Sequence, residues 1–176
     1  VLLRVVCVQP SITEAMLIRG EQVALHDVLE RRLQEHGPFQ FGGHEFAATV
    51  AAVGADVRNC TAGDHVTAVE TVTCGRCPHC RDRRGPVCAR PEFIGFTRPG
   101  AFAELLTVPA ANVVRLPPEM TPPPAPALQP LVGAIHAQVS ARVEPAQSVL
   151  SLGTGGVGLL AVPLARRCGA ARVAAA

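Results

Sequence analysis

The chain contains no lysine, tryptophan or tyrosine, and its aromatic residues are six phenylalanines. It also has little excess charge, because sixteen arginines against fourteen acidic residues give a formal net charge of +2 at pH 7. A charge this close to zero excludes a strongly basic nucleic-acid binder as the default interpretation. No apolar run reaches the roughly 18 residues that a membrane-spanning helix needs. We therefore expect neither nucleic acid nor a membrane among its partners.

A secretion signal is also missing from the sequence. The first residue is Val1, and residues 1–8 have the pattern of a β-strand, with no basic stretch before an apolar one and no cleavage site. We therefore expect a cytoplasmic protein. The 176 residues, of which 48% are hydrophobic and 17% charged, suffice for one domain and a part of a second.

Seven cysteines are present, and four of them lie close together at Cys74, Cys77, Cys80 and Cys88. An odd total without a secretion signal argues against a disulfide framework. The spacing C-x2-C-x2-C-x7-C, on a segment rich in Gly and Pro, allows four thiolates to converge on one tetrahedral ion, so it predicts a structural zinc site. Neighbouring arginines would offset the negative charge that four thiolates leave around one dication. These are Arg76, Arg81, Arg83, Arg84 and Arg90.

Three alternatives to structural zinc stay open at this point. An iron–sulfur cluster also uses C-x2-C-x2-C, although its fourth Cys usually follows after three residues and precedes Pro, whereas here the gap is seven and Ala89 follows. A zinc module for nucleic acid would explain the arginines, and unliganded reduced thiols are the third possibility. The isolated Cys7, Cys60 and Cys168 are expected to act as small apolar residues.

Hydrophobic patterning predicts strands of a small barrel or sandwich, followed by a second α/β part. The predicted strands cover residues 1–8, 45–53, 65–73 and 101–108, and an amphipathic helix covers residues 22–36. Seven prolines between Pro117 and Pro130 indicate a boundary, because proline removes a backbone hydrogen bond from a strand or helix. The segments predicted after it are a helix over 131–141, a strand over 148–152, a helix over 157–168 and the start of a strand over 171–176.

A glycine turn with the pattern G-x-G-x-x-G joins the predicted strand 148–152 to the helix after it. Its residues are Gly153, Thr154, Gly155, Gly156, Val157 and Gly158. Gly153 permits the tight turn, Gly155 lets the backbone approach a pyrophosphate, and Gly158 allows the helix to pack closely on the strand. The turn predicts a dinucleotide site at the helix N-terminus, and a glycine-rich turn without a ligand is the alternative. The acidic residue that would choose NAD over NADP is expected about 20 residues further on, beyond Ala176.

Taken in this order, the strands, the cysteine lobe and the glycine turn resemble the medium-chain, zinc-containing alcohol dehydrogenase family. The motifs that carry the resemblance are G-G-H-E (Gly42–Glu45), G-D-H-V (Gly63–Val66), C-G-R-C-P-H-C (Cys74–Cys80) with Cys88, G-A-F-A-E (Gly100–Glu104) and the turn at 153–158. The resemblance implies a mixed α and β fold. A GroES-like catalytic β-barrel over residues 1–120, with its zinc lobe at 74–88, would precede a linker helix and the first βαβ portion of a truncated Rossmann domain over residues 121–176.

The resemblance also implies an activity and its partners. The family transfers hydride between an alcohol or polyol and NAD or NADP, giving an aldehyde or ketone, and its complete members are expected to be homo-oligomers. Family members have further segments before the position of Val1 and after that of Ala176. We therefore expect a fragment that binds the cofactor poorly and does not oxidise alcohols by itself.

The resemblance places a catalytic zinc site around His44, but two of its ligands differ. His44 matches the family's histidine ligand, Glu45 matches a residue that ligates zinc in some branches, and Thr13 matches the hydroxyl that passes on the alcohol's proton, with Glu14 as the acid after it. Ser11 stands where the family has a Cys ligand, and Gln129 replaces the Glu of an E-P-L motif. Neutral ligands bind zinc more weakly than anionic ones. We therefore expect this second zinc site to be empty or weakly loaded.

Other residues and other functions remain as alternatives. The segment between Ser11 and His44 holds His26, Glu30 and His36, which could supply replacement ligands, and a solvated charged helix face is the other interpretation. The chain could also belong to a zinc-independent or inactive family member that keeps only the structural zinc. A non-enzymatic binding domain stapled by zinc is the third possible function.

Overall fold

The computed structural model describes residues 1–21, 23–120 and 123–176. The packing of the Cα atoms divides the chain into two compact units, Val1–Pro126 and Ala127–Ala176, and each is described by itself. Within the described residues, no helix combines the length and apolar character that crossing a membrane requires.

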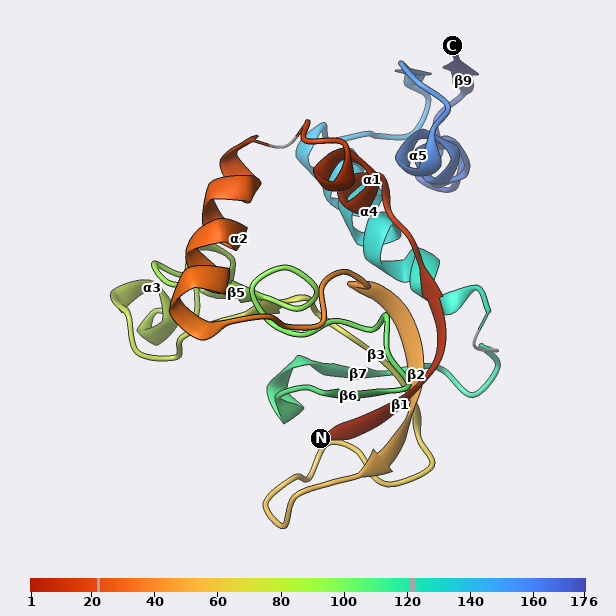
Figure 1. Ribbon diagram of the computed structural model, residues 1–176. Helices are drawn as coiled ribbons and strands as arrows, with labels where there is room; N and C mark the ends of the chain where they lie inside the picture. The colour runs from red at the N-terminus through yellow and green to blue at the C-terminus, as the bar shows by residue number, and fades with distance from the viewer. Residues whose placement is uncertain (22, 121–122) are drawn as a thin grey trace. The chain divides into compact units, whose positions relative to one another are not determined.

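Antiparallel strands form the sheets of the first unit, which has the mixed α and β character expected from the sequence. They are β1 (Leu2–Gln9), β2 (Glu45–Ala52), β3 (His65–Ala68), β4 (Thr71–Val72), β5 (Glu92–Phe93), β6 (Leu105–Thr107) and β7 (Val113–Arg115). Five of them make one sheet in the order β6-β1-β2-β3-β7, and β4 pairs with β5. Figure 1 shows β1 running from the N-terminus toward the first helix.

The core of this unit lies on the sheet of five strands. Leu3 on β1 is opposite Val50 on β2, and both are buried together with Phe46 and Val66. Leu3 and Val66 have exposed neighbours along their strands, Arg4 and His65, which gives the alternation of a sheet with one buried face. Small apolar side chains, chiefly Ala and Val, fill the remaining space of the core.

Three α-helices interrupt the strands of the first unit. They are α1 (Ile12–Ile18), α2 (Val23–His36) and the single turn α3 (Pro78–Arg81). Helix α2 confirms the amphipathic helix predicted for residues 22–36. Helix α1 was not predicted, although Ser11 and Glu14 form a capping box at its start, a signal that the S-I-T-E sequence contains.

Two predicted strands were too long, and side-chain and glycine contacts explain both differences. The segment predicted as one strand over 65–73 is divided into β3 and β4, because the buried Asn112 side chain donates hydrogen bonds to the carbonyls of Val69 and Thr71. The segment predicted over 101–108 is a strand only in β6. Before β6, the Ala101 amide bonds to the Gly43 carbonyl at 2.8 Å instead of joining the main sheet.

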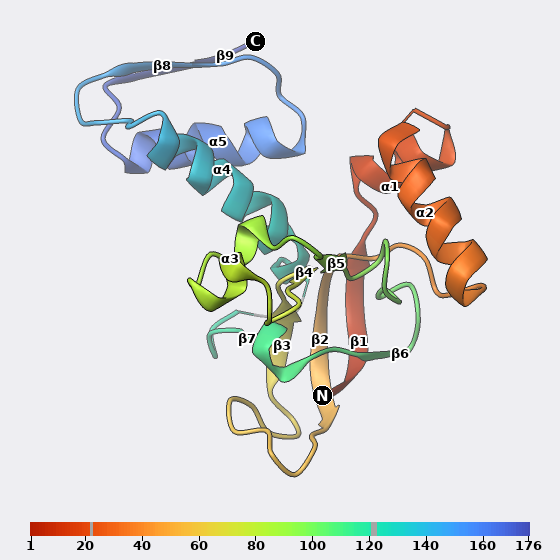
Figure 2. The same ribbon diagram turned by 90° about the vertical axis from the view of Figure 1, so that its left-hand side faces the viewer.

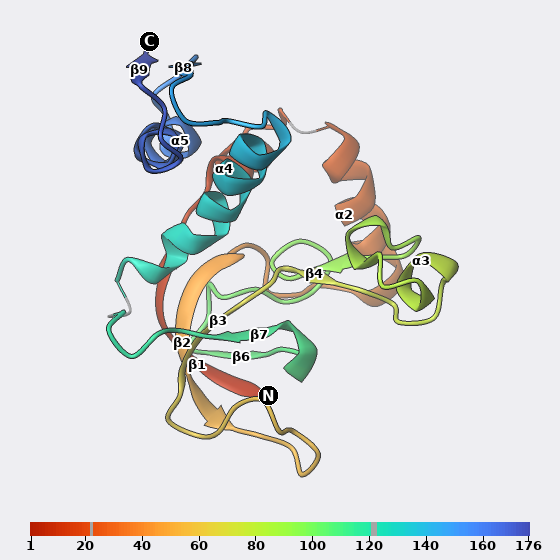
Figure 3. The ribbon, with the colours of Figure 1, turned by 180° about the vertical axis from the view of Figure 1, so that it is seen from behind.

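The second unit contains two helices and two parallel strands. They are α4 (Leu128–Ser140), β8 (Ser148–Ser151), α5 (Gly156–Arg167) and β9 (Arg172–Ala175). Helix α4 begins three residues before the predicted start, because Pro130 lies in its first turn, where a missing N–H costs no helical hydrogen bond. Helix α5 forms as predicted, with Pro163 inside it. Both helices lie on the same side of the β8–β9 pair (Figures 2 and 3).

A close contact between glycines brings together two loops of the first unit, the one between α2 and β2 and the one between β5 and β6. The amide of Gly42 donates to the Gly95 carbonyl at 2.6 Å. Gly42 and Gly43 have φ angles of 81° and 79°, which favour glycine. A Cβ added to Gly100 would lie 1.8 Å from the Gly42 carbonyl oxygen and 2.6 Å from the Gly95 Cα. This packing fixes the backbone immediately before His44.

We expect Gly100→Ala to lower the free energy of unfolding by about 3 kcal/mol, because the new methyl group has no space and its neighbours are backbone atoms. Gly54→Ala is the matched control, since a Cβ there meets no atom within 4 Å. The control should change the free energy by less than about 1 kcal/mol. Chemical denaturation of both variants measures the difference, and equal stabilities would contradict the close-packing account.

Candidate active site and metal centre

The first candidate group is built at the start of α1, where the chain leaves β1. The Ser11 hydroxyl caps the helix by accepting hydrogen bonds from the amides of Thr13 at 3.1 Å and Glu14 at 3.4 Å. In return, the Ser11 amide donates to Glu14 Oε2 at 2.8 Å, and the Ser11 hydroxyl bonds to the same carboxylate. Ser11 therefore acts as a helix cap at the position where the family resemblance places a metal ligand.

The Glu14 carboxylate connects this helix start to His44. Its Oε1 accepts a hydrogen bond from the Gly43 amide at 3.0 Å and lies 2.8 Å from His44 Nδ1. Glu14 and His44 are 2% and 6% exposed, so this charged pair is buried. Sequence analysis identified Glu14 only as the acid that follows Thr13, and the structure adds its role in orienting the His44 ring.

Glu45 lies on the other side of the His44 ring, at the first position of β2. Its Oε1 is 3.7 Å from His44 Nε2, and its Oε2 accepts a hydrogen bond of 2.5 Å from the side-chain amide of Gln9, through Nε2. Gln9 is the last residue of β1 and is opposite Glu45 in the register of the two strands. No sequence motif indicated Gln9, because only the pairing of β1 with β2 brings it to this place.

Burial and mutual attraction set the charges of this cluster. Burial alone would raise the pKa of Glu14, but hydrogen bonds from His44 and Ser11 and the attraction of His44 outweigh it and lower the pKa to about 2. Burial alone would lower the pKa of His44, yet the hydrogen bond and charge of Glu14, together with Glu45 and Glu70, leave it raised. Burial raises the pKa of Glu45, and His44 and Gln9 offset only a part of that effect.

Around His44, the described residues do not form a group of three metal-binding side chains. His44 and Glu45 offer ligand atoms, Ser11 serves as a helix cap, and the Glu14 carboxylate holds His44 Nδ1, as the carboxylate partner of a metal-binding histidine does. Gln129 lies in the first turn of α4. Among the described residues, a group of three or more metal-binding side chains occurs only in the cysteine lobe. That the second zinc site is empty or weakly loaded stays a prediction.

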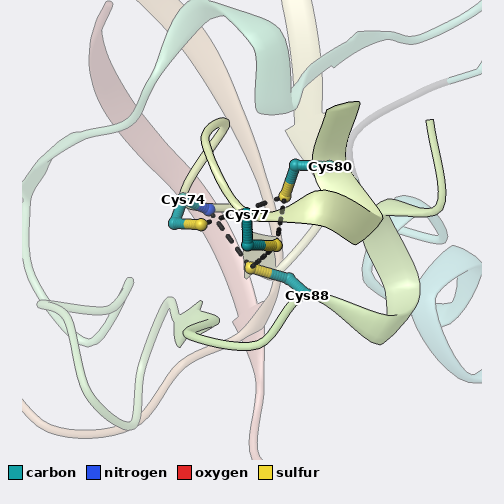
Figure 4. A group of neighbouring side chains, drawn as sticks. All are labelled: Cys74, Cys77, Cys80 and Cys88. Carbon is teal, nitrogen blue, oxygen red and sulfur yellow. Dashed lines mark hydrogen bonds between the residues drawn. The ribbon is translucent and has the colours of Figure 1, made fainter. Parts of the chain in front are cut away.

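The four cysteines of the lobe converge as their spacing predicts. Cys74, Cys77, Cys80 and Cys88 have sulfur atoms within 4.8 Å of one another, and Figure 4 shows them pointing toward a common centre. The Sγ–Sγ distances are 3.5 Å for Cys77–Cys80 and 4.0 Å for both Cys74–Cys80 and Cys77–Cys88. Tetrahedral zinc with Zn–S bonds of about 2.3 Å requires about 3.8 Å between sulfurs. The lobe therefore fits a zinc ion.

Hydrogen bonds from backbone N–H groups favour the thiolate form of these sulfurs. The amides of Cys74 and Arg90 donate to Cys88 Sγ at 3.3 and 3.4 Å. Backbone hydrogen bonds at Ala89 and Cys80 lower the pKa of Cys77 to about 6, whereas burial and the neighbouring sulfurs raise that of Cys80 to about 11. A bound zinc ion would remove the remaining protons. The five arginines expected to offset the charge have exposed side chains, so amides rather than guanidinium groups contact the sulfurs.

The glycine turn of the second unit has the geometry that its sequence predicts. Gly153 has a φ of 101°, and a Cβ on Gly158 would lie 2.0 Å from the Gly153 carbonyl oxygen, so the helix packs tightly on the turn. Gly155 is the N-cap residue of α5, and a Cβ added to it would meet no atom within 4 Å. Thr154, Gly156 and Val157 complete the turn and are exposed. These residues fit a pyrophosphate at the N-terminus of α5.

The other histidines take separate places. His36 and His136 are exposed, and His65 on β3 lies 3.2 Å from the Thr49 hydroxyl through Nδ1. His26 and Glu30 lie on α2 and line a pocket between helices. Within the described part of the chain, neither of them joins His44 in a metal-binding group.

Comparison with known proteins agrees with this geometry. The family model described as the alcohol dehydrogenase GroES-like domain matches residues 1–118. The chain belongs to the zinc-containing alcohol dehydrogenase family. That membership confirms the resemblance found in the motifs and the GroES-like fold.

Individual relatives cover the chain but extend well beyond it. The L-threonine 3-dehydrogenase of Idiomarina loihiensis is 38% identical over 131 residues, which are 74% of this chain and 38% of that protein. The alcohol dehydrogenase of Thermus sp. ATN1 superposes with a TM-score of 0.80 at 30% identity, over 99% of this chain and 49% of that one. The galactitol-1-phosphate dehydrogenase of Escherichia coli gives a TM-score of 0.79 at 31% identity, over 99% and 47%. The chain thus spans about half the length of the solved family structures that it matches.

We expect the purified chain to hold one zinc ion, and Cys80→Ser to release it and loosen the lobe, because zinc binding at such a site contributes to folding. Cys168→Ser is the matched control, since that cysteine is exposed and lies outside the lobe. Elemental analysis gives the zinc content per chain. Absence of zinc in the unaltered chain, or an iron–sulfur absorption band, would contradict the assignment.

We expect Glu14→Gln to lower the free energy of unfolding by about 3 kcal/mol near pH 6, because it leaves His44 buried without its charge partner. The stability that Glu14 contributes is present above its ordinary pKa of 4.5 and is lost as the pH falls toward 2. The stability that His44 contributes is fully present below its ordinary pKa of 6.5 and is lost as the pH rises through its raised pKa. Denaturation at pH values from about 3 to about 9 measures the loss, because this interval contains the ordinary pKa values of both groups.

Glu104→Gln provides the control for this measurement, because Glu104 is exposed. It should leave the free energy of unfolding nearly unchanged across the same pH range. A Glu14→Gln effect that does not vary with pH would show that the pair acts through packing and not through charge.

Proposed function

We propose that the chain supplies the barrel, the zinc lobe and the pyrophosphate-binding turn of an enzyme that transfers hydride between an alcohol and NAD or NADP. The observation that carries the proposal is the match to an alcohol dehydrogenase over 99% of the chain at 30% identity. A further match is described as a zinc-binding dehydrogenase from Sinorhizobium meliloti bound to NADP, with a TM-score of 0.79. It supports a nicotinamide cofactor without choosing between NAD and NADP.

Each unit would have its own task in this enzyme. In the second unit, the turn from Gly153 to Gly158 would hold the cofactor's pyrophosphate against the amides at the start of α5. In the first unit, the structural zinc would hold the lobe around Cys74–Cys88 together and take no part in the chemistry. The glycine packing and the Glu14 carboxylate would hold His44 in one orientation.

The reaction balances as a two-electron oxidation. The carbinol carbon gives a hydride to the oxidised nicotinamide, the hydroxyl loses its proton, and the products are an aldehyde or ketone, the reduced nicotinamide and a proton. The family resemblance assigns Thr13 as the hydroxyl that passes on this proton. His44, kept as a donor by Glu14 on one side and Glu45 on the other, is the buried polar group that would orient the substrate oxygen.

The substrate names of the relatives agree only in the reacting group. L-threonine 3-dehydrogenase and galactitol-1-phosphate dehydrogenase are named for a hydroxy amino acid and a polyol phosphate. Both compounds contain a carbinol, so we propose an alcohol or polyol, with the matching aldehyde or ketone, as substrate class. Assembly of the complete enzyme into homo-oligomers and a cytoplasmic location stay predictions.

Hydride transfer is tested in a chimera, because the chain spans about half of the alcohol dehydrogenase that it matches. Residues 1–176 replace the matching half of the Thermus sp. ATN1 enzyme, and the absorbance of reduced nicotinamide is followed with primary alcohols, secondary alcohols and polyols. We expect turnover with at least one class, and a loss of about 100-fold on His44→Ala, which is the scale of a single acid–base or orienting group.

The control for this assay is Arg84→Gln, since the Arg84 side chain is exposed and pairs with Asp82 in the cysteine lobe. It should keep the activity of the parent chimera. A folded chimera that binds the cofactor but turns over no alcohol faster than its His44→Ala variant would overturn the proposed function.

A further inference from the structure

The cysteine lobe contains a pair of thiols that are placed to react with each other. Cys77, Pro78, His79 and Cys80 form the sequence C-P-H-C, in which Cys77 is the N-cap residue of α3 and Pro78 its first residue. Residues three apart on a helical turn are neighbours, and Figure 4 shows the sulfur atoms of Cys77 and Cys80 facing each other at α3. Two thiols in a C-x-x-C sequence at the start of a helix are a typical setting for reaction with disulfides.

The two sulfur atoms of this pair are closer together than zinc binding requires. Cys77 Sγ and Cys80 Sγ are 3.5 Å apart, whereas the Cys74–Cys80 and Cys77–Cys88 distances are both 4.0 Å. Tetrahedral zinc holds two sulfurs about 3.8 Å apart. A Cys77–Cys80 bond would also close within the turn of α3. Cys74 is separated from that turn by Gly75, whose φ is 69°, and Cys88 follows the end of α3, so other bonds would join separate segments.

The two thiols differ in their access to solvent, and the difference suits two successive steps. Thiol–disulfide exchange needs one sulfur that an external disulfide can reach and a second sulfur that can displace the first product. Cys80 is partly exposed and meets the first requirement. Cys77 is only 6% exposed, but its sulfur lies 3.5 Å from that of Cys80 and meets the second. The order of attack therefore follows from burial.

We propose that Cys77 and Cys80 form a modification site, at which a low-molecular-weight disulfide reversibly oxidises the zinc-binding lobe to a lobe with a Cys77–Cys80 disulfide. The assignment goes beyond hydride transfer, because it depends on the sulfur geometry of the lobe and not on the site around His44. It is also compatible with a chain that has no disulfide framework, since disulfides in reducing compartments are usually transient and redox-sensing.

The reaction balances as two exchanges between sulfurs. The Cys80 thiolate attacks one sulfur of the external disulfide, whose S–S bond breaks and releases the first small thiolate. The Cys77 thiolate then attacks Cys80 Sγ in the mixed disulfide, a Cys77–Cys80 bond forms, and the second small thiolate leaves. The protein pair loses two electrons, and the external disulfide gains them as two thiolates. No proton is transferred, because both cysteines react as thiolates.

The new bond would leave the lobe with too few ligands for zinc. Only Cys74 and Cys88 would keep their thiolates, whereas structural zinc sites use four protein ligands. Because zinc binding contributes to the folding of such a site, the oxidised lobe should release the ion and loosen. A dithiol that reduces the Cys77–Cys80 bond would restore all four ligands, so the change should be reversible when zinc is present.

Peptide mapping of the unaltered chain tests which bond forms. The zinc-loaded chain is treated with 2-hydroxyethyl disulfide, zinc release is followed with a coloured chelator, and the remaining thiols are alkylated before digestion with trypsin. Trypsin cleaves after Arg76 and Arg81, so a Cys77–Cys80 disulfide stays within the peptide 77–81, whereas every other bond of the lobe links two peptides. We expect the oxidised peptide 77–81 to appear together with the released zinc, and dithiothreitol with zinc to reverse both. Linked peptides that contain Cys74 or Cys88 would overturn the proposal.

Two matched variants test whether the pair controls zinc release. Cys80→His removes the pair but keeps a zinc ligand, because sites with three Cys and one His also bind structural zinc. Cys88→His changes one ligand in the same way and keeps the pair, so it is the control. We expect zinc loss in 2-hydroxyethyl disulfide to be at least about tenfold slower in Cys80→His than in Cys88→His, since exchange rates depend on which sulfur is attacked.

Equal rates of zinc loss in the two variants would overturn the proposal. If Cys80→His does not hold zinc, the peptide map of the unaltered chain decides the question by itself. Neither measurement uses alcohol or cofactor, so a negative result here leaves the proposed hydride transfer standing, and an inactive chimera leaves the modification site standing.

Discussion

The arrangement of the first unit around His44 depends on the hydrogen bonds of the buried Glu14 carboxylate. It completes the cap of α1 with Ser11, accepts the Gly43 amide and holds His44 through Nδ1. Two segments that are about 30 residues apart in sequence, the start of α1 and the Gly43–His44 pair, thus meet at one charged group. Such a group is expensive to bury alone, and each hydrogen bond it accepts lowers that cost. The position of the His44 ring is therefore a consequence of the charge of Glu14 and not of the sheet alone.

The glycines around this carboxylate allow the backbone of Gly43 and His44 to approach it. Gly42 and Gly43 adopt φ angles that side chains disfavour, and Gly100 packs against the Gly42 carbonyl at a distance that no Cβ could share. The GroES-like fold thus uses residues without side chains to bring two loops together directly before His44. Loosening this contact would free the backbone of His44.

The two zinc positions expected from the family differ in what holds them. Cys74, Cys77, Cys80 and Cys88 come from one short stretch, so a local fold brings the sulfurs together whatever the rest of the chain does. The site around His44 draws on separate segments, and in this chain the position of the missing Cys ligand has become the cap of α1. The chain thus has the four sulfurs of the structural site, while the expected Cys position of the second site is occupied by a helix-capping serine.

The sequence by itself determined the features that depend on neighbours in the chain. The Cys spacing predicted the converging sulfurs, the glycine pattern predicted the turn before α5, and periodicity predicted α2, because each is a local property of one segment. Tertiary structure decided the rest. It placed Gln9 against Glu45 through strand pairing, divided the strand predicted over 65–73 through the side chain of Asn112, and set the space between α1 and α2. These features arise from contacts between residues far apart in the sequence, where the energies of burial and hydrogen bonding, and not local propensity, select the structure.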